Sequence, residues 1–210
     1  MPPSDLVLYV DAQFASPYAM SVFVALQEKR CHVEMRPLDL SAGAHHEPGF
    51  AARSLTRRVP TLVDGDFALS ESTAILEYLD ESLPGPRLYP ADVRARARAR
   101  QLQAWLRSDL LPLRQERSTE VLFYGPTTAA LSPAATSASE RLFAALDSVL
   151  PPRQDFLFGR WSIADVDVAL MLNRLVLNGD PVPRRLADYA TLQWQRPSVQ
   201  AWVRQPRPPR

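Results

Sequence analysis

The sequence has few of the residues that build disulfides and metal sites. Its 210 residues include one cysteine, Cys31, and three histidines. A single cysteine excludes an intrachain disulfide, a dithiol redox pair and a cysteine-rich metal centre. We therefore expect no metal cofactor, and we interpret Cys31 as a structural residue.

Strong net charge and long apolar segments are also missing. The formal net charge is +1, so no overall field favours nucleic acid or an anionic membrane. No run approaches the ~18 apolar residues of a membrane-spanning helix. Residues 1–5 show no basic segment followed by an apolar one, as a secretory signal would. These absences favour a cytoplasmic protein with neither nucleic acid nor a membrane as a partner.

The first part of the chain predicts alternating strands and helices. Ser16-Pro17 is typical of a helix start, with serine as the N-cap and proline at the first helical position. The predicted order is strand, helix, strand, hairpin and helix, over residues 6–10, 16–26, 33–38, 62–69 and 72–83. This order predicts an α/β thioredoxin-like domain over residues 1–83.

The second part of the chain predicts helices only. Pro84-Gly85-Pro86 begins a linker over residues 84–91, and residues 92–210 form an all-α domain. The apolar spacing predicts helices over residues 92–115, 133–150 and 163–177. Pro112 either kinks the first of these or starts a new turn. We expect the tail from residue 207 to be loose.

The most informative stretch joins Val59-Pro60 to Glu71-Ser72. An X-Pro bond can be cis at a cost of only ~0.5–1 kcal/mol. A cis bond here would turn the backbone N–H and C=O of Val59 outward, where an extended ligand can pair with them. Glu71-Ser72 then opens a helix, where hydroxyl and free N–H groups attract a carboxylate. The stretch is therefore suited to holding a small anionic peptide.

This arrangement resembles the glutathione-binding half of the glutathione transferase superfamily. Ser162 and Asp165, spaced as a capping box, resemble the start of the central helix in the second domain of that family. The resemblance implies that the backbone of Val59, beside Pro60, holds the cysteinyl part of glutathione. It also implies that Glu71-Ser72 holds the γ-glutamyl carboxylate and amine, with glutathione as the cosubstrate.

Members of this family activate the glutathione thiol with a hydroxyl or a cysteine near the end of the first strand. This sequence has Ser16-Pro17-Tyr18 where thiol-using members have Cys-Pro-Tyr or Cys-Pro-Phe. The resemblance therefore implies that Ser16 donates a hydrogen bond to the sulfur and forms no mixed disulfide. Ser16 could instead serve only as a helix cap. Tyr18 is a rival hydroxyl, whereas we interpret Tyr9, within an apolar strand, as a core residue.

Four residues compete for the glycine carboxylate of glutathione: His45, His46, Arg53 and Arg58. The histidines fall in the loop where relatives use a basic or amide side chain for this contact, and Arg58 is also consistent with a solvated side chain. Two adjacent histidines without a third ligand are poor evidence of a metal site.

The second-substrate pocket has a weaker signature. Tyr18, Trp105 and Tyr124 are its candidate residues, with Phe123 beside the last, although ordinary core packing explains the aromatic residues of the helical part equally well. Arginines between residues 94 and 107 form a basic stripe that we interpret as a solvated or dimer-facing surface.

Together, the resemblance implies a bacterial glutathione transferase that forms a homodimer, with its site in the cleft between the two domains. The expected reaction is thiolate attack on small electrophiles, as in detoxification, with glutathione-dependent peroxidase activity as an addition. One alternative is a glutathione-dependent isomerase or dehalogenase, although the sequence lacks the Ser-Ser-Cys start of maleylacetoacetate isomerases. Another is a non-catalytic module that binds ligands or proteins.

Overall fold

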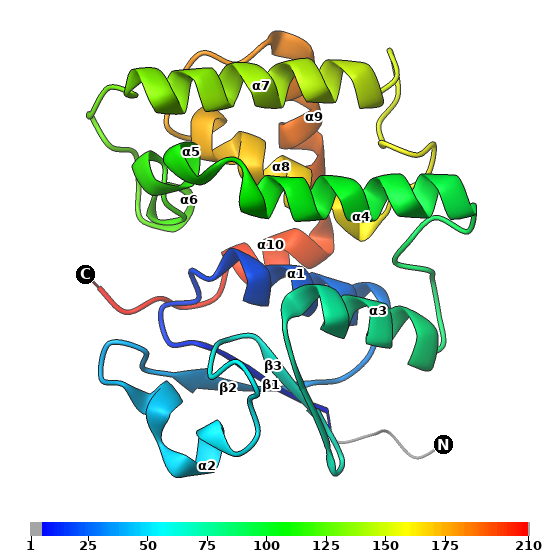
Figure 1. Cartoon of the computed structure of the whole chain (residues 1–210), viewed down its shortest axis with the longest axis vertical. Helices are drawn as coiled ribbons and strands as arrows, with labels where there is room; N and C mark the ends of the chain where they lie inside the picture. The colour runs from blue at the N-terminus through cyan, green and yellow to red at the C-terminus, as the bar shows by residue number, and fades with distance from the viewer. Residues whose placement is uncertain (1–5, 210) are drawn as a thin grey trace. The chain divides into compact units, whose positions relative to one another are not determined.

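The computed structural model describes residues 6–209 (Figure 1). The expectations for residues 1–5 and for Arg210 lie outside this range. The chain forms two compact units. One contains the described residues up to Leu88 and those from Gln200 onward, and the other runs from Tyr89 to Val199. The sequence assigns residues 92–210 to one helical domain, whereas the structure groups the last residues with the first unit.

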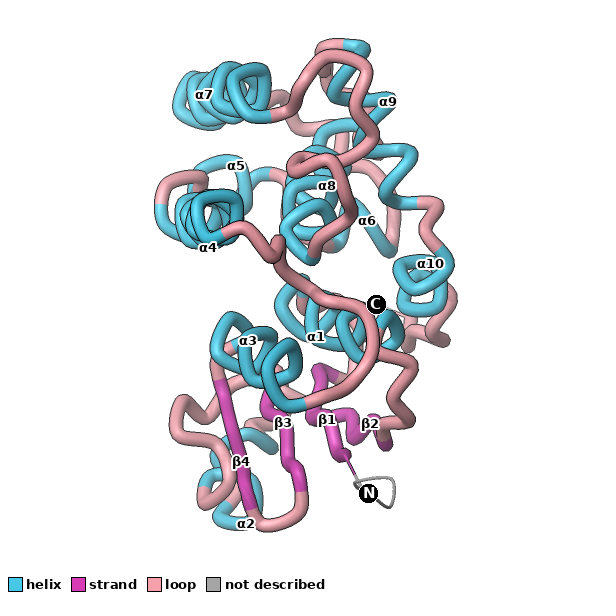
Figure 2. The backbone as a smooth tube through the Cα atoms, turned by 90° about the vertical axis from the view of Figure 1, so that its right-hand side faces the viewer, coloured by secondary structure: helices cyan, strands magenta, loops and turns pink. Residues whose placement is uncertain are grey.

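The first unit is built on a four-stranded sheet in the order β2-β1-β3-β4 (Figure 2). Its strands are β1 (Leu6–Asp11), β2 (Glu34–Leu38), β3 (Thr61–Asp64) and β4 (Phe67–Ser70). Strand β1 is parallel to β2 and antiparallel to β3, and β3 and β4 form the predicted hairpin. All residues of β1 are buried, because β1 is an interior strand and helices cover both faces of the sheet (Figure 2).

Helices cover both faces of this sheet (Figure 2). Helices α1 (Pro17–Glu28) and α3 (Ser72–Ser82) lie on one face, and the short α2 (Pro48–Ala51) lies on the other. A 3-10 turn, η1 (Ala44–His46), precedes α2. Phe50 of α2 packs edge-on against Tyr9, with ring centroids 5.2 Å apart, so Tyr9 is a core residue, as predicted. The element order confirms the thioredoxin-like domain.

The second unit is helical, as predicted. Its helices are α4 (Val93–Ser108), α5 (Leu111–Glu116), α6 (Glu120–Phe123), α7 (Pro133–Val149), α8 (Ile163–Val176) and α9 (Arg184–Trp194). The division between the units falls within α10 (Pro197–Val203). The single helix predicted over residues 92–115 is two helices. Pro112 lies in the first turn of α5, where its missing N–H breaks no helical hydrogen bond, so it starts a new helix.

Helix α8 is the centre of the second unit, and its first turn is held by Asp165. The Ser162 N–H donates to Asp165 Oδ2 at 2.8 Å. The Leu157 N–H at 2.9 Å and the Tyr189 hydroxyl at 2.8 Å donate to Asp165 Oδ1. Burial raises the pKa of Asp165, while these hydrogen bonds oppose the shift. Asp165 is therefore the structural capping residue that the sequence predicted.

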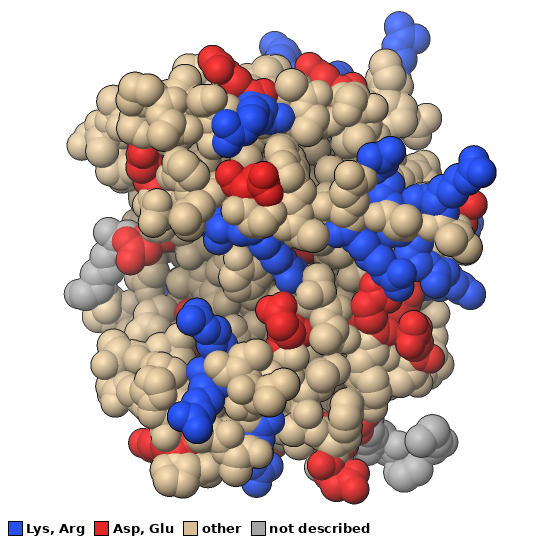
Figure 3. Space-filling model, in the orientation of Figure 1, with Lys and Arg blue, Asp and Glu red and all other residues tan. Residues whose placement is uncertain are grey.

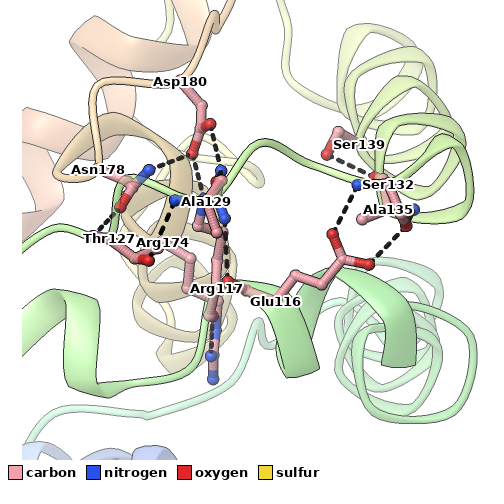
Figure 4. A network of polar contacts seen from close by, with 10 residues as sticks. All are labelled: Glu116, Arg117, Thr127, Ala129, Ser132, Ala135, Ser139, Arg174, Asn178 and Asp180. Atoms are coloured by element: carbon pink, nitrogen blue, oxygen red, sulfur yellow. Dashed lines mark hydrogen bonds and ion pairs between the residues drawn. The ribbon is translucent and has the colours of Figure 1, made fainter.

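A polar network ties the loop between α6 and α7 to its neighbours (Figure 4). Arg117 is buried and forms an ion pair with Asp180, with 2.6 Å between Nε and Oδ2. The same guanidinium donates to the Ala129 carbonyl at 2.9 Å, and Glu116 accepts from the Ser132 N–H at 2.7 Å. The Thr127 N–H also donates to Asn178 Oδ1 at 2.8 Å, so the loop is held at Thr127, Ala129 and Ser132. The buried charge of Arg117 is paired.

Basic side chains gather over α4 (Figure 3). Arg94, Arg98 and Arg100 are exposed there, in the predicted basic stripe. Within the part of the chain that the structure describes, no helix combines the length and the apolar character needed to cross a membrane.

Candidate functional site

The residues predicted to bind glutathione come from segments that join the strands at one end. We call this end, where β1, β2 and β4 finish and β3 begins, the sheet edge. Tyr9, near the end of β1, pairs with Thr61 at the start of β3, and Thr61 pairs with Ser70 at the end of β4. Because β2 is parallel to β1 and pairs with it through Asp11 and Leu38, the loop after β2 leaves from the same edge. The four segments at this edge carry Ser16, Val59-Pro60, Glu71-Ser72 and His45.

Ser16 caps α1, as the sequence predicted. Its Oγ accepts a hydrogen bond from the Ala19 N–H at 3.2 Å. The Asp11 carboxylate accepts from the backbone N–H of Ala15 at 2.7 Å and of Ser16 at 3.0 Å, and so holds the loop that presents the hydroxyl. Capping uses a lone pair of the hydroxyl, whereas a hydrogen bond to a thiolate uses its proton. The two roles of Ser16 are therefore compatible.

The Val59-Pro60 peptide bond is cis and lies directly before β3. Two buried hydroxyls support the turn that precedes it. Thr61 Oγ1 lies 2.9 Å from Ser54 Oγ and 2.9 Å from the Arg58 carbonyl oxygen. Ser54 Oγ also accepts from the Arg58 N–H at 3.3 Å. These contacts fix the backbone of Arg58, and Val59 follows it with its side chain packed against the core.

Glu71 and Ser72 start α3 in an unusual way. Glu71 has φ 83° and ψ 109°. Positive φ in a non-glycine residue costs on the order of 1–3 kcal/mol and is concentrated at ligand sites. Ser72 is buried, and its Oγ has no hydrogen-bond partner among residues 6–209. Because an unpaired buried hydroxyl costs about 1–3 kcal/mol, a polar ligand that reached Ser72 would remove that cost.

A second unpaired polar atom at this edge, after Ser72 Oγ, belongs to His45. Its Nδ1 is buried and finds no hydrogen-bond partner within the described part of the chain. The His45 ring lies against that of His46, with centroids 3.9 Å apart. The side chains of Arg53 and Arg58, its rivals for the glycine carboxylate, are exposed. His45 is thus the candidate whose polar atom is removed from water and still unpaired.

The residues suggested for the second substrate lie in or directly after three different helices. Tyr18 lies in the first turn of α1, Trp105 lies in α4, and Tyr124 directly follows α6. All three are half-buried. The Phe123 and Trp194 rings pack together in the second unit, with centroids 6.3 Å apart. The pocket itself stays a prediction.

Three residues that support the site were missed by the sequence analysis: Asp11, Ser54 and Thr61. All are buried polar residues. Asp11 had a readable signal, because an aspartate between a strand and a helix start can bind the backbone N–H groups of the turn. Ser54 and Thr61 come into contact because the loop that carries Ser54 folds back onto β3. No local sequence pattern predicts this contact.

The described residues contain no group of three or more His, Cys, Asp and Glu side chains that could hold a metal ion. Cys31 is half-buried, and its Sγ lies 3.6 Å from the Lys29 carbonyl oxygen. The polar groups at the sheet edge are hydroxyls, an imidazole, the Glu71 carboxylate and backbone N–H groups, which can meet both signs of charge on a small peptide.

The fold defines a class of protein: a thioredoxin-like domain followed along the chain by a helical unit. Family profiles match both parts. The profile described as "Glutathione S-transferase, N-terminal domain" matches residues 13–87, and "Glutathione S-transferase, C-terminal domain" matches residues 92–205, more than half of the chain. The chain belongs to the glutathione S-transferase family.

Curated relatives are similar over different lengths. Human glutathione S-transferase theta-1 is 38% identical over 106 residues, which cover 50% of this chain and 43% of the human protein. A probable maleylacetoacetate isomerase of Vibrio cholerae is 34% identical over 120 residues, covering 56% of this chain and 55% of that protein. The chain thus spans about half the length of these two relatives. Theta-1 of Mus musculus is 31% identical over 199 residues, covering 90% and 82%.

Solved structures are similar over nearly the whole chain. A glutathione transferase homolog from Burkholderia GL BGR1, with bound glutathione, is 46% identical, with a TM-score of 0.77 and coverage of 96% of this chain and 97% of that one. A maleylacetoacetate isomerase from Methylobacterium extorquens AM1, with bound malonate and glutathione, is 29% identical, with a TM-score of 0.74 and coverage of 97% and 100%.

Proposed function

We propose that the protein is a glutathione transferase that binds glutathione at this sheet edge and promotes ionisation of its thiol. The observation that carries the proposal is the buried, unpaired Ser72 Oγ at the N-terminus of α3, next to Glu71 with its positive φ. The hydroxyl and the positive end of the helix dipole suit the γ-glutamyl carboxylate. Glutathione bound to the Burkholderia relative supports the choice of ligand.

The rest of glutathione would follow the same edge. The Glu71 carboxylate would accept from the γ-glutamyl amine, and the Val59 backbone would pair with the cysteinyl residue, as the family resemblance implies. His45, with its unpaired Nδ1, would donate to the glycine carboxylate, with Arg58 as the exposed alternative. Each end of the peptide would thereby meet a group that complements its charge.

Activation of the thiol has a reasonable energetic basis. Lowering its pKa by two units requires ~2.7 kcal/mol of preference for the anion. A hydrogen bond from Ser16 to the charged sulfur would contribute ~1.5–3 kcal/mol. The N-terminus of α1, which Ser16 caps, would add ~0.3–1 kcal/mol. Together the two effects contribute ~1.8–4 kcal/mol, a range that contains the required ~2.7 kcal/mol.

The reaction proposed for the bound thiolate is nucleophilic attack on a small electrophile, as in detoxification. The sulfur forms a bond to an electrophilic carbon while the bond to the leaving group breaks and that group departs with the electron pair. The thiol proton has already passed to solvent. With a hydroperoxide, attack on the oxygen would break the O–O bond, release an alcohol and leave a glutathione sulfenic acid, which a second glutathione would convert to the disulfide and water. Tyr18, Trp105 and Tyr124 are the proposed second-substrate residues, and the proposal includes a cytoplasmic homodimer.

Ultraviolet difference absorbance tests this function. Glutathione is added at neutral pH, and calorimetric titration establishes separately that the site is saturated. We expect a thiolate band in the saturated protein. Saturation without the band would contradict thiol activation and favour a non-catalytic binding module, while the absence of binding would contradict the glutathione site itself.

A glutathione-dependent isomerase is the second candidate, because two maleylacetoacetate isomerases are among the similar proteins. Against it, the first helix here starts with Ser16-Pro17-Tyr18 and not with Ser-Ser-Cys. Measuring glutathione during turnover separates the two functions. Transfer consumes glutathione in step with product, whereas isomerisation of maleylacetoacetate leaves its concentration unchanged.

A further inference from the structure

The C-terminal end of the chain packs against the loop that carries Ser16. Trp202, in the last turn of α10, is completely buried. Its ring lies 5.6 Å from that of Phe14 and 5.3 Å from that of Phe23, centroid to centroid. Phe14 belongs to the loop between β1 and α1, and Phe23 belongs to α1. The indole therefore joins the loop to the helix that follows it.

Arg207 continues this contact beyond the end of α10. Its Nη2 donates to the Phe14 carbonyl at 3.0 Å and to the Trp202 carbonyl at 3.1 Å. Its Nη1 donates to the Val203 carbonyl at 2.7 Å and to the Gln205 carbonyl at 3.0 Å. The structure therefore differs from the expected loose tail at Arg207, because four carbonyl oxygens hold its guanidinium.

The loop has an unusual backbone where Arg207 reaches it. Phe14 has φ 47°, in the left-handed region that non-glycine residues rarely adopt. Its N–H donates to the Asp11 carbonyl at 3.0 Å, which closes a tight turn. The Phe14 ring is held by Trp202 and its carbonyl by Arg207, so the C-terminal segment supports this conformation through two separate contacts.

The peptide group between Phe14 and Ala15 is bound at both of its polar atoms. Its carbonyl accepts from Arg207 at 3.0 Å, and its N–H donates to Asp11 Oδ2 at 2.7 Å. The next N–H, that of Ser16, donates to the other oxygen of the same carboxylate at 3.0 Å. Rotation of this peptide group would break both contacts and move the residue that caps α1.

We propose that Arg207 is a positioning residue, which fixes the direction of the Ser16 hydroxyl by clamping the Phe14–Ala15 peptide group against Asp11. Arg207 acts through the loop and touches neither the hydroxyl nor the thiol. Its catalytic consequence rests on the proposed function of Ser16, whereas the clamp itself does not. Loss of the clamp leaves the proposed glutathione contacts at Val59 and Ser72 in place. We therefore expect it to raise the pKa of the bound thiol without weakening the affinity for glutathione.

Amide hydrogen exchange of the full-length protein without glutathione tests the clamp. The variants are Arg207→Gln, Arg207→Lys and the control Arg204→Gln, an exposed arginine in the same segment that loses the same charge. We expect the Ala15 and Ser16 amides to exchange about tenfold faster in Arg207→Gln, relative to the amides of β3, because a charged hydrogen bond is lost. Lysine restores one charged donor group, so the exchange rate in Arg207→Lys should lie between those of Arg207→Gln and the wild type. The rate in Arg204→Gln should equal that of the wild type.

Unchanged exchange at Ala15 and Ser16 in a folded Arg207→Gln protein would overturn the clamp. If that variant does not fold, Arg207→Lys decides. Its exchange at these two amides, measured relative to the amides of β3, should still be faster than in the wild type. Equal protection in Arg207→Lys and the wild type would then overturn the proposal.

The apparent pKa of the bound thiol tests the catalytic consequence. At saturating glutathione it should be higher in Arg207→Gln than in Arg204→Gln, with a lower kcat and a KM for glutathione within a few-fold of the wild type. Faster exchange with an unchanged thiol pKa would overturn the link to Ser16. If the wild type itself shows no thiolate, the proposed function fails, while the exchange data still decide the clamp.

Discussion

Lys29, the only lysine of the sequence, lies 3.5 Å from Asp80 Oδ1, and the two side chains are 2% and 8% exposed. The ammonium also donates to the carbonyl oxygens of Asp80 at 3.3 Å and of Leu83 at 3.0 Å. Asp80 Oδ1 in turn accepts from the Leu88 N–H at 2.6 Å. This buried pair joins α1 to the end of α3 and to the last residues before the second unit.

Replacing Lys29 by methionine should therefore destabilise the protein strongly. The change leaves the Asp80 carboxylate buried without its cation, a loss of about 3–5 kcal/mol in comparable pairs. Urea unfolding of Lys29→Met and the wild type measures the effect. The control is Arg30→Met, at the exposed neighbouring residue, with an expected change within about 0.5 kcal/mol. Equal stability of the two variants would show that the pair contributes nothing.

The Ser16→Ala variant should separate thiol activation from binding. Without the hydroxyl, the apparent pKa of the bound thiol should rise by one to two units, because ~1.5–3 kcal/mol is lost at ~1.36 kcal/mol per unit. Glutathione affinity should stay within a few-fold. Ser132→Ala is a matched control, since Ser132 caps α7 through the Ala135 N–H at the same 3.2 Å. An unaltered pH–rate profile in Ser16→Ala would exclude Ser16 as the activator.

The Ser72→Ala variant should weaken glutathione binding without weakening the fold. Losing a hydrogen bond to a carboxylate should raise the dissociation constant about tenfold to a hundredfold. The melting temperature without glutathione should be unchanged or higher, because the removed hydroxyl is buried and unpaired. Ser82→Ala, at the exposed end of the same helix, should leave affinity unchanged. Normal affinity in Ser72→Ala, measured by calorimetry, would remove the main support for the proposed site.

Glu116 should stabilise the second unit above mildly acidic pH. Hydrogen bonds from the Ser132 hydroxyl and N–H lower the pKa of Glu116 from its ordinary 4.5. A lowered pKa in the folded state means that the contribution is complete above pH 4.5 and is lost as the pH falls through the folded value. The difference in melting temperature between the wild type and Glu116→Gln should therefore shrink below that pH. Glu140→Gln, on an exposed position of α7, should show no such trend.

Asp165 should have the opposite pH dependence. Burial raises its pKa above the ordinary 3.8, so its contribution is complete below pH 3.8 and is lost as the pH rises through the folded value. Over that interval the wild type should lose stability relative to Asp165→Asn, whose side chain does not titrate. A difference that grows in favour of the wild type as the pH rises would contradict this assignment.

The sequence predicted elements best where local signals were explicit. Ser16-Pro17 marked the start of α1, and the Ser162 and Asp165 spacing marked the start of α8. Helix α9 was missed, and it begins after Pro183 without a side-chain cap. The split between α4 and α5, just before Pro112, was left open, since proline is compatible both with a kink and with a first turn.

The candidate site shows the same division. Val59-Pro60 and Glu71-Ser72 could be recognised because a short motif carries them. Their position at one edge with Ser16 depends on the pairing of Tyr9 with Thr61 and on the parallel pairing of β1 with β2. Strand pairing joins residues that are far apart in the sequence, and no local pattern specifies it.

Composition, caps and motifs by themselves determined the thioredoxin-like order and the helical second half, and they predicted the hydroxyl and backbone groups of the candidate site. Only the tertiary structure decided that Ser72 Oγ and His45 Nδ1 would be buried and unpaired, and that Arg207 would bind the carbonyl of Phe14. The physical reason is range. Capping and turn formation act within a few residues, whereas burial and the Arg207 contact depend on segments that only folding brings together.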